Sequence, residues 1–288
     1  MGQPTTATQA RGPSAIVGRM DFCPRGEKVI FYPGEREKSQ WPYKEHEVLI
    51  RDARQVAGEL GLEKTGFVLL ERASAVGNFW DREEVERVYL PEVRALVAEL
   101  TRADKVITFG TMLRTDAERT AQHNLPAYGA HVDYGDYTVR EFAIEILGRD
   151  EAEEWLEDRY MLINVWRPIT VVKRAPFAVC DASTVAASDL CDSEVRGGLG
   201  DPNRPTLYGH AVAFNENQRW YYVPEMRPNE VLAFKLYDSD PTAVQWSAHS
   251  AFKHPDTAPD APPRESIEIR TISFLKKGSE PFFPEKGL

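Results

Sequence analysis

The sequence lacks the features that mark secreted and membrane-spanning proteins. Its 288 residues include only three cysteines (Cys23, Cys180 and Cys191), and none of them forms a CxxC pair. An odd number of isolated cysteines fits a reducing compartment better than a disulfide framework. No apolar run approaches the roughly 20 residues that a membrane span needs, and no signal peptide is recognisable. We therefore expect a cytoplasmic protein without a membrane partner.

Positive charge is also scarce, which bears on the partners of the chain. Lys and Arg number 35 against 45 Asp and Glu, so the net charge is −10. Such a chain repels a phosphate backbone, and no basic stripe compensates, which argues against a nucleic-acid partner. No glycine-rich nucleotide turn follows a predicted strand, which argues against a methyltransferase. We expect a small-molecule substrate, and a homodimer is compatible with the sequence.

The first half of the chain predicts a tail followed by mixed secondary structure. Residues 1–14 are small and polar and are expected to be disordered. The segment 46–72 predicts a strand, a short helix and a second strand. Asp81 and Glu84 resemble a capping box that begins an amphipathic helix, which Pro91 should bend or split.

The second half of the chain is rich in short strands. Residues 105–113 predict one strand, and 138–160 predict two helices that meet at Gly148. Seven further strands are expected at 162–172, 176–182, 208–214, 219–223, 231–238, 244–252 and 266–275. This number of short strands predicts a mainly β jelly roll, the double-stranded β-helix of cupin-type barrels, with helices packed outside. With no linker in view, we expect one domain over residues 15–288 with its barrel at about 105–275.

The stretch 129-GAHVDYGDY-137 suggests a metal site. On an extended backbone, His131 and Asp133 point to the same face, so an imidazole and a carboxylate converge. Two histidines and one carboxylate leave coordination positions open, as in non-haem Fe(II) oxygenases. Since two of the six histidines (His46 and His123) are expected in surface loops before the barrel, the third ligand should be one of three: His210, His249 or His254.

An Arg-x-Ser triplet enters the last predicted strand. A dicarboxylate co-substrate that chelates iron needs its far carboxylate held by a planar, permanently charged group, which Arg provides better than Lys. Arg264 fits this role, and the Ser266 hydroxyl would add one hydrogen bond from the same face. Arg270 lies on that face too if the strand is regular, and it is the alternative anchor.

Several segments in order resemble one known family. They are HVD, INVWRPI, the Asp181-Ala182-Ser183 turn, RWYYVPEM, FKLYDSD, HSAF and PRESIEIR. Together they are similar to the gibberellin GA4 desaturase and CmcJ-like family, non-haem iron, 2-oxoglutarate-dependent oxygenases of secondary metabolism. The similarity runs from about residue 48 to 274. In that family the distal metal histidine precedes Ala-Phe or Thr-Ala-Phe, which implies His249 as the third ligand here.

The resemblance implies an Fe(II)- and 2-oxoglutarate-dependent dioxygenase that uses dioxygen. Oxidative decarboxylation of 2-oxoglutarate would give succinate and CO2 and drive hydroxylation, desaturation, or ring or peroxide formation on a secondary metabolite. We expect Tyr134, Tyr137 and Arg167 near the substrate pocket, with a core position as the alternative for Tyr134. Two other functions stay open: a cupin-type metalloenzyme that does not use 2-oxoglutarate, and a non-catalytic partner subunit.

Overall fold

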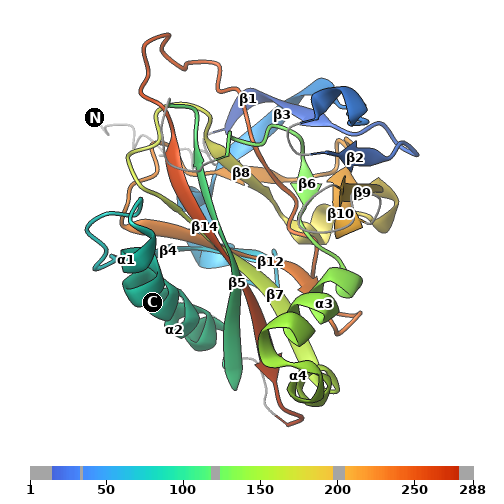
Figure 1. Ribbon diagram of the computed structural model, residues 1–288. Helices are drawn as coiled ribbons and strands as arrows, with labels where there is room; N and C mark the ends of the chain where they lie inside the picture. The colour runs from blue at the N-terminus through green and yellow to red at the C-terminus, as the bar shows by residue number, and fades with distance from the viewer. Residues whose placement is uncertain (1–14, 33–34, 118–123, 197–204, 279–288) are drawn as a thin grey trace, which may run out of the picture.

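The computed structural model describes residues 15–32, 35–117, 124–196 and 205–278. The tail expected at 1–14 and His123 lie outside these ranges. The described strands form two sheets, one of nine strands and one of five, which curl toward each other (Figure 1). Among the helices in these ranges, none has the length and apolar character needed to cross a membrane.

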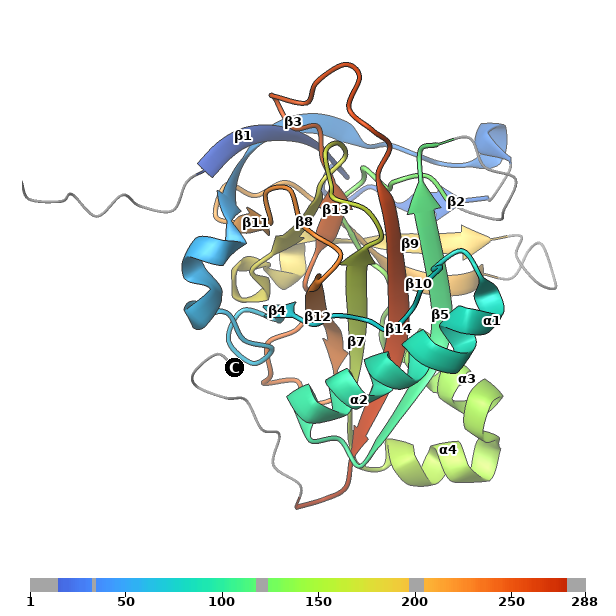
Figure 2. The ribbon, with the colours of Figure 1, turned by 90° about the vertical axis from the view of Figure 1, so that its left-hand side faces the viewer.

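The smaller sheet is antiparallel, with the strand order β4-β12-β7-β14-β5. Its strands are β4 (Phe67–Glu71), β12 (Glu230–Asp238), β7 (Arg159–Pro168), β14 (Glu265–Leu275) and β5 (Lys105–Thr115). The central strands are buried along most of their length because helix α2 (Leu90–Thr101) covers one face and the larger sheet covers the other. Figure 2 shows α2 lying across this sheet.

The larger sheet is mixed and has the order β1-β3-β11-β8-β13-β6-β10-β9-β2. Its strands are β1 (Ala15–Phe22), β3 (Lys44–Asp52), β11 (Trp220–Tyr222), β8 (Phe177–Cys180), β13 (His249–Ala251), β6 (His131–Val132), β10 (Pro205–Val212), β9 (Leu190–Arg196) and β2 (Val29–Phe31). The short strands β13 and β6 are neighbours at its centre. Segments more than 100 residues apart in sequence therefore meet there.

The helices begin and end where local chemistry requires. The Asp81 side chain accepts hydrogen bonds from the backbone of Glu83 and Glu84 and so caps α1 (Arg82–Glu84). A π-helical turn, η3 (Val85–Tyr89), separates α1 from α2, and Pro91 lies in the first turn of α2. Pro91 has no N–H for a helical bond, so the predicted interruption of this helix is confirmed.

The other predicted helix break is also confirmed. Helices α3 (Asp136–Leu147) and α4 (Arg149–Leu156) meet at Gly148, whose φ of 81° favours glycine. Both helices lie at one end of the barrel, outside the sheets (Figure 1). The expected strand, short helix and strand at 46–72 are β3, the 3-10 helix η2 (Ala53–Glu59) and β4.

Three sequence expectations need correction. His46 lies in β3, where its ring stacks on Phe214 with 4.5 Å between centroids, and not in a surface loop. The strand expected at 244–252 shrinks to β13 because Trp246 has a φ of 70°, which interrupts an extended backbone. Strands β1, β2 and β9 were not expected at all.

Candidate active site

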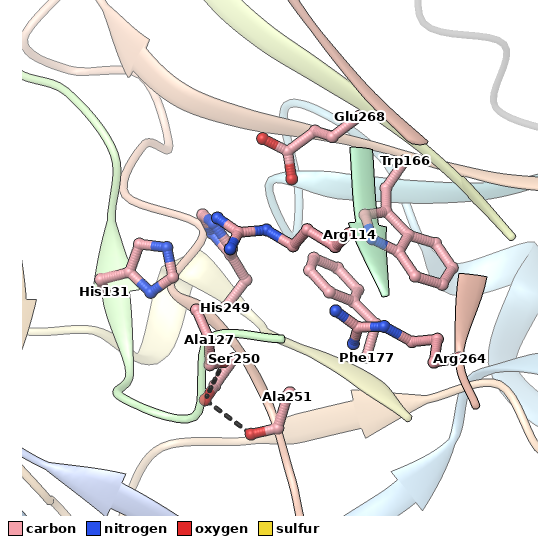
Figure 3. Close-up of a pocket in the computed structure, with 10 residues that line it drawn as sticks. All are labelled: Arg114, Ala127, His131, Trp166, Phe177, His249, Ser250, Ala251, Arg264 and Glu268. Atoms are coloured by element: carbon pink, nitrogen blue, oxygen red, sulfur yellow. Dashed lines mark hydrogen bonds between the residues drawn. The ribbon is translucent and has the colours of Figure 1, made fainter. Parts of the chain in front are cut away.

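A small cavity opens between the two sheets. The larger sheet contributes the face that carries His131 and His249, the smaller sheet contributes Trp166, and Arg264 lies immediately before β14 (Figure 3). The complete lining is Arg114, Ala127, His131, Trp166, Phe177, His249, Ser250, Ala251, Arg264 and Glu268. Two histidines and two arginines thus share one small, mostly enclosed space.

His131, Asp133 and His249 form a cluster suited to a metal ion. Their ligand atoms all lie within 4.8 Å of one another. The Asp133 Oδ1 atom lies 3.4 Å from His131 Nε2 and 3.9 Å from His249 Nε2. The neighbouring strands β6 and β13 hold the two imidazoles side by side, with 4.3 Å between ring centroids. Two nitrogens and one oxygen on one side of a point match the donor set of a non-haem Fe(II) site.

Backbone carbonyls fix how the two histidines present their nitrogens. His131 Nδ1 lies 2.7 Å from the Gly129 carbonyl, and His249 Nδ1 lies 3.2 Å from that of Ser247. A carbonyl only accepts, so Nδ1 carries the proton and donates it, which leaves Nε2 free as a ligand. Both free Nε2 atoms face Asp133. This arrangement fits a resident metal ion.

The protonation states also suit metal binding. Burial, with a smaller contribution from His131, lowers the pKa of His249 to about 3. Burial opposes ionisation of Asp133, but Arg270 and the two histidines hold the pKa of its carboxyl well below the ordinary value. At neutral pH the site therefore presents a neutral imidazole and a carboxylate, the forms that bind metals.

The backbone of Asp133 passes very close to Gly209 on β10. A Cβ atom built on Gly209 would lie 2.4 Å from the Asp133 carbonyl oxygen and 2.6 Å from that of Val132. Pairing of β10 with β6 (His210 with Val132, Ala211 with His131) holds this contact in place. Glycine is needed here for close approach, and this approach positions two of the three candidate ligands.

We predict that Gly209→Ala weakens metal binding by about 10- to 100-fold, as loss of a ligand-orienting partner does. The added methyl group must push the Asp133 backbone away from the histidines. Titration of the apo-protein with Mn(II) measures the effect. Gly58→Ala is the matched control, because a Cβ there meets nothing within 4 Å. Wild-type Mn(II) affinity in Gly209→Ala would show that Gly209 does not position Asp133.

The second oxygen of Asp133 is held by the smaller sheet. Asn164 Nδ2 donates to Asp133 Oδ2 over 2.9 Å and to Glu268 Oε1 over 3.0 Å. Arg270 lies 3.5 Å from Asp133 Oδ2 and 3.6 Å from Glu268 Oε1. Its guanidinium also covers the Tyr134 ring at 4.8 Å. Arg270 therefore already has two carboxylate partners, both supplied by the protein.

Arg264 is in the opposite situation. Its side chain is 1% exposed and lines the cavity, yet no carboxylate in the part of the chain that the structure describes lies within ion-pair distance. One nitrogen donates to the Ala175 carbonyl over 2.8 Å, while Nε has no hydrogen-bond partner among the described residues. Within the same residues, the buried Ser266 Oγ also lacks a partner. Burial, and secondarily Arg114, lowers the pKa of Arg264 to about 9. Arg264 and Ser266 therefore offer hydrogen-bond donors that an anionic ligand could accept from.

The remaining predicted residues lie elsewhere. His210 is in β10 beside Tyr137 and Tyr208 on the wall of a separate hollow. His254 lies 3.4 Å from the Tyr222 hydroxyl and accepts from the backbone of Asp256, away from the triad. Neither joins the cluster of candidate ligands.

The three candidate pocket residues are not brought together. Tyr134 is buried beneath Arg270 and packs on Phe109, while Tyr137 is half exposed beside Tyr208. Arg167 points to the outer face of β7, where it donates to the Tyr89 hydroxyl over 3.1 Å. The structure thus places Arg167 outside the cavity, and Tyr134 behind it.

Sequence reasoning missed four residues of this site: Arg114, Asn164, Gly209 and Glu268. The signal for Glu268 was available, since polar residues occupy the alternate positions 264, 266, 268 and 270 of the segment 264-RESIEIRTISFL-275. Asn164 is likewise a lone amide in the apolar run LINVW. Arg114 and Gly209 carry no such signal, because their roles depend on cross-strand neighbours.

Known proteins are similar in sequence to most of this chain. A family model described as "Oxidoreductase/YMDC permease-like domain" matches residues 24–274. The "Fe(II)/2-oxoglutarate-dependent dioxygenase nvfI" of Aspergillus novofumigatus is 33% identical over 253 residues, covering 86% of this chain and 89% of the relative. The "Hydroxylase/desaturase efuI" of Hormonema carpetanum is 32% identical over 256 residues, covering 81% and 84%.

A solved structure extends the likeness to three dimensions. It is titled "iron and alpha-ketoglutarate-dependent endoperoxidase NvfI with different conformation" and matches with a TM-score of 0.82 at 30% identity, covering 93% of this chain and 100% of that one. The expected jelly-roll fold is confirmed by this match. The chain belongs to the family of Fe(II)/2-oxoglutarate-dependent dioxygenases that includes these fungal secondary-metabolite enzymes.

Proposed function

We propose that His131, Asp133 and His249 hold Fe(II), and that Arg264 with Ser266 binds the far carboxylate of 2-oxoglutarate. The observation that carries the proposal is Arg264, a buried cation in the cavity of the triad with no carboxylate of the described residues within ion-pair distance. A buried charge is costly unless it is paired, so the site is built to receive an anion. The planar guanidinium suits a carboxylate, and Ser266 adds a hydroxyl donor beside it.

The chain supplies position and exclusion of water. When bound, iron, 2-oxoglutarate and dioxygen together supply the oxidising chemistry, with succinate and CO2 as products of the co-substrate. Trp166 and Phe177 stack with 4.8 Å between centroids and form an apolar wall of the cavity. The His131 side chain is 21% exposed and that of His249 only 3%. We infer that the organic substrate approaches from the His131 side.

We propose a small organic secondary metabolite as the substrate. The relatives carry titles that include hydroxylase/desaturase and endoperoxidase, so hydroxylation, desaturation and peroxide formation are the candidate outcomes. The segments resembling the gibberellin GA4 desaturase and CmcJ-like family support the same range. We include in the proposal one oxygenase domain over residues 15–288, a cytoplasmic location and a homodimer.

Anaerobic titration of the apo-protein with Fe(II) and then 2-oxoglutarate tests the core of this proposal. We expect saturable iron binding, followed by a weak visible charge-transfer band when the co-substrate chelates the metal. Iron binding without the band would favour a cupin-type metalloenzyme that does not use 2-oxoglutarate. No iron binding at all would favour a non-catalytic partner subunit.

A further inference from the structure

A second arginine, Arg114, reaches into the same cavity. It lies near the end of β5, directly across from Ser266 of β14. The only hydrogen bond of its side chain within the described ranges is from one nitrogen to the Leu125 carbonyl over 2.8 Å, and no carboxylate there lies within ion-pair distance. Like Arg264, it is a cavity cation without a protein anion.

The Arg114 side chain reaches the end of the cavity that holds the histidines. Figure 3 shows the Arg114 side chain extending toward His131 and His249, while the Arg264 guanidinium lies beside Trp166 and Phe177. The two guanidiniums thus point toward different parts of one cavity.

The charges of the cavity give a reason for two arginines. Glu268 lines the cavity, and its carboxylate would repel a dianionic ligand if it is ionised. Arg270 does not offset that ligand, since it is held between Asp133 and Glu268. Arg264 alone would face one end of a dicarboxylate, while the other end, beside the metal, would have no guanidinium of its own.

We propose that Arg114 binds the 2-oxo acid end of 2-oxoglutarate, so that each carboxylate has its own guanidinium. This inference rests on the proposed co-substrate and names a residue for its second end. A carboxylate on the organic substrate is the alternative ligand for Arg114. Arg114 lies directly across from Ser266, which the proposed function assigns to the co-substrate, and it lines the same cavity as Arg264, which favours the co-substrate.

Binding of two 2-oxo acids to the Mn(II)-loaded protein without oxygen separates these roles. The probes are 2-oxoglutarate and 2-oxovalerate, which shares the 2-oxo acid end but has no far carboxylate. We expect Arg114→Gln to weaken both probes by a similar factor, about 10- to 100-fold for a partly exposed charge pair. Arg264→Gln should weaken 2-oxoglutarate alone. Arg94→Gln, which removes an equal charge from an arginine bonded to Thr108, is the control.

Each other outcome overturns the assignment in a different way. Unchanged binding of both probes by Arg114→Gln would remove Arg114 from the co-substrate site. Weakening of 2-oxoglutarate alone would place Arg114 at the far end with Arg264. A wild-type protein that binds Mn(II) but neither probe would contradict the proposed function itself. Mn(II) affinity of Arg114→Gln should not fall, because loss of a nearby cation does not disfavour a metal ion, so a fall would indicate a disrupted fold.

Discussion

His249→Ala should abolish turnover and weaken metal binding by more than about 100-fold, whereas His254→Ala should change neither. Loss of a partner that merely orients a ligand weakens a metal site by 10- to 100-fold, so loss of the ligand itself should exceed that. His249 Nε2 faces Asp133 Oδ1 at 3.9 Å, while His254 contacts Tyr222. Mn(II) titration and product formation with the true substrate measure both effects. If the two variants exchange behaviour, His254 is the third ligand.

Two milder variants distinguish loss of metal binding from loss of the folded state. His249 packs against Phe234 with 4.8 Å between ring centroids, so its truncation also leaves a cavity in the core. His131 is partly exposed on a two-residue strand, and Asp133→Asn keeps the shape of the side chain. His131→Ala and Asp133→Asn should therefore lose metal with a smaller change in the free energy of unfolding. Wild-type metal affinity in both would remove the HxD triplet from the metal site.

The predictable part of the fold lies in its continuous apolar strands. The stretch 162-LINVWRP-168 is recognisable as a strand from its sequence because both of its faces are buried. Strand β9 is not, since 190-LCDSEVR-196 is polar and becomes a strand only by pairing with β10 and β2. Such pairings join residues far apart in the sequence. Local patterns therefore carry little information about them.

The candidate site shows the same division. The HxD spacing predicts that His131 and Asp133 point to the same side. In contrast, Arg264 and Arg270 occupy alternate positions of one segment, so the sequence does not distinguish their roles. In the structure they differ in their partners: Arg270 lies beside Asp133 and Glu268, whereas Arg264 donates to the Ala175 carbonyl. Arg167 illustrates the converse: its neighbour Trp166 lines the cavity, so alternation along β7 directs Arg167 to the other face. If Trp166 is known to face the cavity, the alternation along β7 is enough to predict that Arg167 faces away from it.

Arg264→Leu should raise the Kd for 2-oxoglutarate by at least about 30-fold, since loss of one member of a buried charge pair costs about 2–5 kcal/mol. Arg264→Lys keeps the charge but loses the two-pronged geometry, so it should fall between leucine and the wild type. Calorimetric titration of the Mn(II)-loaded protein with 2-oxoglutarate measures the series. Wild-type affinity in the leucine variant would move the anchor to Arg270 or remove it.

The same variant should change the unliganded protein in the opposite direction. Without co-substrate, Arg264 is a fully buried cation with one carbonyl acceptor and an unpartnered Nε. Replacing an unpaired buried charge by an apolar side chain is often neutral or stabilising. We therefore expect the Tm of unliganded Arg264→Leu to equal or exceed that of the wild type, while stabilisation by added 2-oxoglutarate disappears. Arg270→Leu should instead lower the Tm, because it leaves Asp133 and Glu268 without their shared cation. A fall in Tm for both variants would mean that Arg264 holds the fold together and is not reserved for a ligand.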